Sequence, residues 1–62
     1  MKKGDIVKIY QKPFTDEDFE GEAKLIKKIG MAEDYGEFQI EDWMVEFERD
    51  KPSQFRRRIK IK

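Results

Sequence analysis

Residues 43–48, with the sequence Trp-Met-Val-Glu-Phe-Glu, decide the fold of this chain. The apolar side chains of Trp43, Val45 and Phe47 occupy every second position, which is the pattern of a β-strand with one buried face. The sequence Asp-Lys-Pro-Ser at residues 50–53 is a turn signal, and a run of β-forming residues follows at 55–61. The two segments therefore predict an antiparallel hairpin at the C-terminal end of the chain.

Working outward from this hairpin, residues 6–10 form a second clear strand because Ile, Val and Tyr favour extended backbone. Pro13 ends that strand, since proline has no backbone N–H to donate. Residues 11–20 are expected to be a polar, acidic loop, and residues 30–37 a connection. The apolar positions Phe38 and Ile40 are out of phase with Trp43, which predicts a bulge or turn at residues 41–42.

Residues 15–30 fit two structures. As a helix, Thr15 is the N-cap, acidic residues fill the first turn, lysines fill the last turn, and Gly30 is the C-cap. As a strand, Gly21 begins the segment, and Ala23 and Leu25 share one face. Gly21 weakens the helix, yet the local signals taken alone slightly favour it.

Two short motifs resemble the opening of small SH3-like barrels: Gly-Asp-Ile-Val-Lys-Ile at residues 4–9 and Gly-Glu-Ala-Lys-Leu-Ile at residues 21–26. Residues 43–47 and the basic strand ending at Ile59 resemble the hairpin that follows in such barrels, an architecture shared by Tudor and KOW modules. The whole chain also resembles short uncharacterised bacterial and phage proteins with Ile-Tyr-x-x-Pro, Glu-Gly-Glu-Ala and Trp-x-Val-x-Phe in this order. No proline-binding tyrosines and no complete KOW signature are present, so no binding residue is carried over.

The resemblance implies a fold class. We expect residues 1–62 to form a single mainly β domain, a small SH3-like barrel of four to five antiparallel strands, with residues 15–29 as loop plus strand. The alternative is an α+β domain in which a helix at about 15–29 packs on a three-stranded sheet. One fold of this type supports many functions, so the fold by itself predicts none.

The amino-acid composition excludes several kinds of functional site. The chain of 62 residues has no cysteine and no histidine. Disulfides and thiolate or imidazole metal sites are thereby excluded, and the commonest general base and strongest nucleophile are missing. We expect a non-enzymatic protein without cofactor or metal. No apolar stretch is long enough to span a bilayer, so a cytoplasmic location is the default expectation.

The charges are arranged in blocks although the net charge is zero. The basic C-terminal strand, extended by two lysines from an earlier part of the chain, is a candidate nucleic-acid-binding face. Its members are Arg56, Arg58, Lys60, Lys62, Lys24 and Lys28. We rank this hypothesis below a salt-bridged face in which Glu46 and Glu48 neutralise the arginines across the hairpin. Arg57 interrupts the inner, apolar side of the same strand.

Exposed aromatic residues beside the acidic loop form a candidate protein-contact surface, consisting of Tyr10, Phe14 and Phe19. An aromatic cage for a cation is a further hypothesis, built from Tyr10, Phe14, Tyr35 and Trp43, although Trp43 fits the core better. The sequence therefore predicts a small interaction module of unknown specificity, with an unidentified protein partner ranked ahead of nucleic acid. Exposed sheet edges also allow a homodimer.

Overall fold

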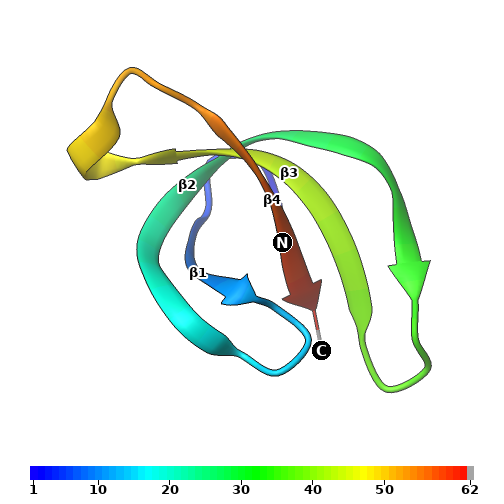
Figure 1. Cartoon of the computed structure of the whole chain (residues 1–62). Helices are drawn as coiled ribbons and strands as arrows, with labels where there is room; N and C mark the ends of the chain where they lie inside the picture. The colour runs from blue at the N-terminus through cyan, green and yellow to red at the C-terminus, as the bar shows by residue number, and fades with distance from the viewer. Residues whose placement is uncertain (62) are drawn as a thin grey trace.

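The computed structural model describes residues 1–61, which form one antiparallel sheet with the strand order β1-β2-β3-β4 (Figure 1). The strands are β1 (Ile6–Lys12), β2 (Glu17–Asp34), β3 (Gln39–Phe47) and β4 (Phe55–Ile61), with a short 3-10 helix, η1 (Glu48–Asp50), between β3 and β4. The mainly β prediction is confirmed. The helix proposed as an alternative for residues 15–29 is wrong, because this part of the chain is turn and strand.

Neighbouring strands decide the conformation of β2 against its local helical signals. Its first half pairs with β1, with Ala23 opposite Val7, and its second half pairs with β3, with Lys28 opposite Trp43. A strand paired on both sides satisfies its backbone groups and buries Ala23 and Leu25 on one face. These gains depend on residues far away in the sequence, which is why local propensity does not reveal them.

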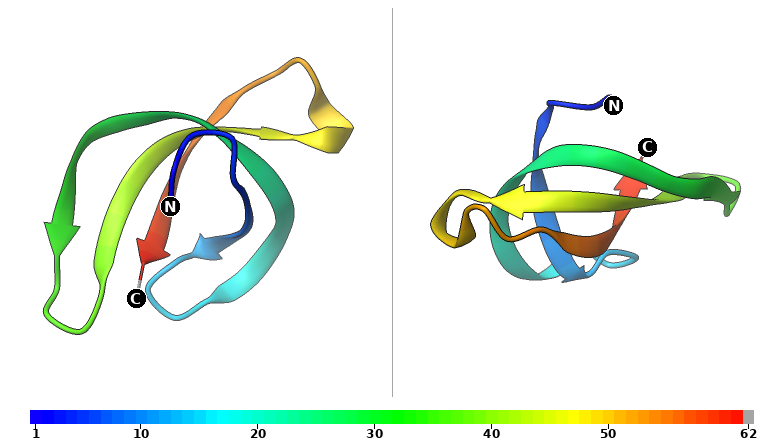
Figure 2. Two further views of the ribbon diagram at one scale, coloured as in Figure 1. Left: turned by 180° about the vertical axis from the view of Figure 1, so that it is seen from behind. Right: turned by 90° about the horizontal axis from the view of Figure 1, so that it is seen from above.

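The sheet is strongly curled but does not close into a barrel. Figures 1 and 2 show β2 and β3 bending as long arcs, and the register of β2 is irregular at three places where such bending is accommodated. In the part of the chain that the structure describes, no ladder of hydrogen bonds joins β1 to β4. The two edge strands therefore leave one side of a small barrel-like sheet open.

The core lies on the concave face of the curled sheet and draws on all four strands. It consists of Ile9, Ala23, Leu25, Trp43, Val45, Phe47 and Ile59. The inward positions of Trp43, Val45 and Phe47 confirm the alternation on which the prediction of the β3–β4 hairpin rests. No helix within residues 1–61 has the length and hydropathy needed to cross a membrane.

Three expectations about the connections are wrong. The loop expected at residues 11–20 is a turn of residues 13–16, and the connection expected at 30–37 is shortened because β2 continues to Asp34. The irregularity expected at residues 41–42 lies in the opposite strand and not in β3: β3 pairs with β4 without interruption from Gln39 to Val45, whereas the register of β2 shifts between Ile29 and Glu33, opposite Asp42 and Ile40. The change of phase instead reflects two faces: Ile40 is buried but lies outside the core cluster that contains Trp43.

A matched pair of substitutions on β1 tests the assignment of the core. Ile9 is 1% exposed and Ile6 is 60% exposed. We expect Ile9→Val to lower the free energy of unfolding by about 0.5–1.5 kcal/mol, because it removes a buried methylene group. Ile6→Val should change that free energy by less than about 0.5 kcal/mol. Urea unfolding followed by Trp43 fluorescence measures both, and equal effects would contradict the assignment.

Candidate binding groove at the open side of the sheet

A groove of about 540 Å³ lies between the β1–β2 hairpin and the beginning of β4. One wall is made by residues 10–15 and Glu17, and the other by residues 56–58. Two sets of residues that the sequence singled out separately therefore meet at one place: Tyr10 and Phe14 on the first wall, and Arg56 and Arg58 on the second. The groove exists because β1 and β4 are the unpaired edges of the sheet.

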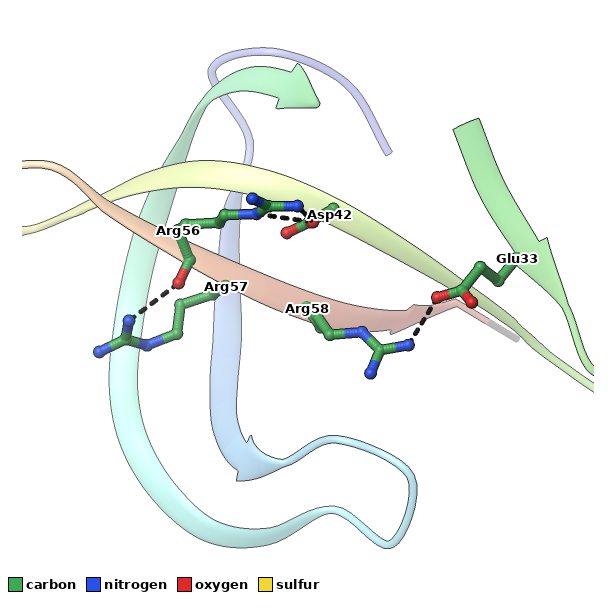
Figure 3. A network of polar contacts seen from close by, with 5 residues as sticks. All are labelled: Glu33, Asp42, Arg56, Arg57 and Arg58. Carbon is green, nitrogen blue, oxygen red and sulfur yellow. Dashed lines mark hydrogen bonds and ion pairs between the residues drawn. The ribbon is translucent and has the colours of Figure 1, made fainter. Parts of the chain in front are cut away.

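Each of the outward cations of β4 has a carboxylate partner. Arg56 donates from Nε and Nη2 to Asp42 Oδ2, and Arg58 donates from Nη2 to Glu33 Oε1 (Figure 3). Lys60 Nζ lies 3.0 Å from Asp16 Oδ2. These hydrogen bonds raise the pKa of Arg56 and of Arg58, so both guanidinium groups stay charged.

The salt-bridged face is thus present, but its partners are not the ones the sequence suggested. Glu46 and Glu48 were expected opposite the arginines; Glu48 instead pairs with Lys51 at 2.8 Å. The register explains the difference, because Arg56 lies opposite Met44 and its guanidinium therefore reaches the next residue on the same face of β3, Asp42. The side chains of Arg56 and Arg58 are 67% and 46% exposed, so solvent screens both pairs and each contributes little to the stability of the fold.

Arg57 is partly buried, and three of its nitrogen atoms donate hydrogen bonds. Its Nε and Nη2 donate to the two carboxylate oxygens of Glu20 at 2.7 and 3.0 Å, and its Nη1 donates to the carbonyl of Arg56 at 2.9 Å. The Arg57 hydrogen bond is the largest cause of a lowered pKa at Glu20, opposed by partial burial and helped by the charge of Arg49. This fork joins β2 to β4 without any backbone ladder between them.

A β-bulge places Glu20 where Arg57 can reach it. Ile9 lies opposite Gly21 and Tyr10 opposite Phe19, so Glu20 is the additional residue of β2 at this point. Gly21 has a φ of +138°, which favours glycine, and Arg49 Nη1 occupies the space that a Cβ would need. The bulge therefore turns the Glu20 carboxylate away from the regular ladder and toward β4.

A second group of contacts borders the groove on the other side. The rings of Phe14, Tyr35 and Phe38 pack together with centroid separations of 5.0–5.9 Å. Arg58 lies over the Phe14 ring and Lys60 over the Phe38 ring, each at 5.4 Å. The protein's own cations thus occupy these ring faces, and the contacts fix the position of Phe14 in the groove wall.

The aromatic cage expected from the sequence does not form. Trp43 is buried in the core, and the Tyr10 ring packs against Phe19 at 5.5 Å. Only Phe14 and Tyr35 of the expected four residues come together, and Phe38 joins them. Phe19 is 57% exposed but does not line the groove.

The lysines of β2 do not extend the basic face of β4. Strand β3 lies between β2 and β4, and Lys28 pairs with Glu41 of β3 at 3.3 Å. Lys24 lies opposite Glu46 and borders a separate cavity of about 210 Å³. Lys62, the last member of the predicted basic face, lies outside the described residues.

Sequence reasoning missed Glu20 and Pro13 as parts of this site. One signal was available for Glu20: Arg57 occupies an inward position of a strand, and an inward charge requires a partner. Gly21 was a second signal, because an isolated glycine in a strand often marks a bulge. The identity of the partner could not be deduced, since it depends on the register between β1 and β2.

Comparison of the chain with models of protein families, with curated proteins and with solved structures finds no match. What the groove does is therefore argued from its own geometry and chemistry.

The lowered pKa of Glu20 predicts a pH-dependent contribution to stability. The ionised carboxylate stabilises the folded state above the unfolded-state pKa, near 4.5, and this stabilisation is lost as the pH falls through the lower folded-state value. We expect Glu20→Gln to reduce the free energy of unfolding at pH 7 by about 1–2 kcal/mol, because Arg57 loses a charged partner. The difference from the wild type should shrink below pH 4.5.

Urea unfolding at pH 7, 4.5 and 3 measures this dependence. Glu37→Gln is the matched control, since Glu37 is exposed and has no ion pair among residues 1–61. The control should follow the wild type at every pH. A difference between Glu20→Gln and the wild type that stays constant with pH would show that the ionised pair does not form.

Proposed function

We propose that this chain is a non-catalytic interaction module that binds an extended segment of a partner protein in the groove between residues 10–15 and β4. The observation that carries the proposal is the groove itself, which is about 540 Å³ in volume and places the rings of Tyr10, Pro13 and Phe14 opposite the arginines at residues 56–58. A volume of this size accommodates several side chains of a bound segment.

The apolar wall has the properties of a protein-contact surface. Tyr10, Pro13 and Phe14 are rings with few rotatable bonds, so ordering them against a partner costs little conformational entropy. Phe14 is further fixed by Tyr35 and Phe38. A preformed aromatic contact of this kind provides most of the affinity in many protein interfaces.

Nucleic-acid binding through Arg56, Arg58 and Lys60 is the second candidate. Rings and cations at one groove also suit a single-stranded polynucleotide. Each of these three cations nevertheless has a carboxylate within ion-pair distance, and the net charge of the chain is zero. A long polynucleotide would extend beyond the groove over the acidic residues of a chain whose net charge is zero, which favours a protein partner with contacts confined to the groove.

We further propose that the fold is an open variant of the small SH3-like barrels. The protein would then be a bacterial or phage protein that acts in the bacterial cytoplasm. The support for this proposal is the succession of four antiparallel strands in chain order, together with the motifs at residues 4–9, 21–26 and 43–47. In this arrangement the two edge strands that would close a barrel form the mouth of the binding site.

Selection of displayed random peptides on the full chain tests the proposed function. We expect the selected peptides to shift the NMR signals of residues 10–15 and 56–58. Phe14→Ala should weaken their binding about 30-fold, which is the effect of losing a central aromatic contact. The matched control is Met31→Ala, which removes a 91% exposed apolar side chain of β2 outside the groove.

Binding to the control should stay within a factor of about three of the wild type, since exposed residues outside an interface contribute little. Selected peptides whose signals map elsewhere, or equal losses for the two variants, would contradict the assignment of the groove.

A further inference from the structure

We infer that the bound segment is acidic: an extended peptide with carboxylates at alternate positions, laid along the free edge of β4 and held by Arg56 and Arg58. This inference rests on the proposed function, because it names the chemistry of the occupant of the same groove. Its starting point is the lining of that groove, in which four side chains are cationic and one is acidic. These are Lys12, Arg56, Arg57, Arg58 and Glu17.

The four cations are not equally available. Arg57 uses Nε, Nη1 and Nη2 in hydrogen bonds to Glu20 and to the Arg56 carbonyl. Arg56 directs Nε and Nη2 at a single oxygen of Asp42, and its Nη1 donates no hydrogen bond within residues 1–61. Arg58 donates to Glu33, whose side chain is itself half exposed. Lys12 Nζ lies 3.6 Å from Asp18 Oδ2 at the exposed end of the hairpin. Among the three arginines, Arg56 and Arg58 are thus the two with capacity for a further carboxylate.

A guanidinium carries five N–H donors, so a second carboxylate binds without removal of the first. The present partners are also easily exchanged, because solvent screens exposed ion pairs and leaves them little net stability. A ligand carboxylate placed in the groove, next to the rings of Tyr10 and Phe14, would be less hydrated than one on the open surface. Charge-assisted hydrogen bonds are stronger in such surroundings.

The spacing of the two arginines specifies an extended ligand. Arg56 and Arg58 are two residues apart on one strand, which separates them by about 6.7 Å along the edge. A peptide in the same extended conformation repeats its side chains at that interval, so alternate carboxylates match the two guanidinium groups. A helix or a compact turn does not offer this repeat.

The backbone of β4 supports the same geometry. Only β3 pairs with β4 in the described residues, so the other edge is free of strands. The carbonyl of Arg56 accepts one hydrogen bond from the Arg57 side chain, and its second lone pair remains for a donor of the peptide. Strand addition to a free edge supplies main-chain hydrogen bonds, while the flanking side chains provide specificity.

The test uses three synthetic ten-residue peptides with blocked ends and, as a fourth probe, a ten-nucleotide thymidine strand. In the first peptide Glu alternates with Thr and Tyr; in the second and third, Gln and Lys replace every Glu. Calorimetry and NMR titration of the full chain measure affinity and site at low and near-physiological salt. We expect the Glu peptide to bind at least about 10-fold more tightly than the Gln peptide, with shifts along β4.

Substitutions test whether the two arginines cause the preference for the Glu peptide over the Gln peptide. The double substitution Arg56→Gln and Arg58→Gln should make the Glu and Gln peptides bind alike, and Arg56→Lys with Arg58→Lys should restore part of the difference. The control removes two cations outside the groove, Lys24→Gln with Lys28→Gln, and should leave the preference intact. Trp43 fluorescence verifies that each variant is folded.

The outcomes separate the two proposals. Equal or tighter binding of the Gln or Lys peptide in the groove overturns the acidic ligand and leaves a protein-binding groove. Absence of binding by all three peptides overturns the acidic ligand, and failure of the displayed-peptide selection then overturns the groove as well. Binding of the thymidine strand at residues 56–58, with steep loss at higher salt, replaces the acidic peptide by nucleic acid.

Discussion

A guanidinium–carboxylate fork between Arg57 and Glu20 connects two strands that share no backbone hydrogen bonds, and the open side of the sheet depends on it. The two residues are 37 positions apart, with donor–acceptor distances of 2.7 and 3.0 Å. The bulge before Gly21 directs the Glu20 carboxylate toward β4. Arg49 Nη1 donates a hydrogen bond to the backbone carbonyl of Glu20 at 3.0 Å. In a domain whose core supplies only about 3–5 kcal/mol, one such contact is a substantial part of the stability.

The groove follows because side chains alone join β4 to the β1–β2 hairpin. A complete ladder between β1 and β4 would fill the space with backbone, whereas a side-chain connection leaves room between residues 10–15 and 56–58. Free strand edges can pair with strands of other chains and cause aggregation. Charged side chains on an edge strand commonly prevent this. Arg56, Arg58 and Lys60 place charges of this kind on β4.

Elements whose evidence is local could be predicted from the sequence. The alternation of Trp43, Val45 and Phe47 correctly gave a strand and its buried face, and the turn at residues 50–53 gave the hairpin partner. Residues 15–30 could not be assigned in this way, because a good N-cap and C-cap compete with strand pairing that only distant residues reveal. The ion-pair partners of Arg56 and Arg57 could not be predicted from the sequence either, because the strand register and one β-bulge determine them.

Amide hydrogen exchange along β4 tests most directly whether the side of the sheet that forms the groove is open. The account predicts alternating protection over residues 55–61: amides that pair with β3 exchange slowly, and those that face the free edge exchange quickly. Slow exchange at every position of β4, matched by slow exchange along both edges of β1, would mean that the two strands pair in solution. The sheet would then be a closed barrel, and the groove would not exist.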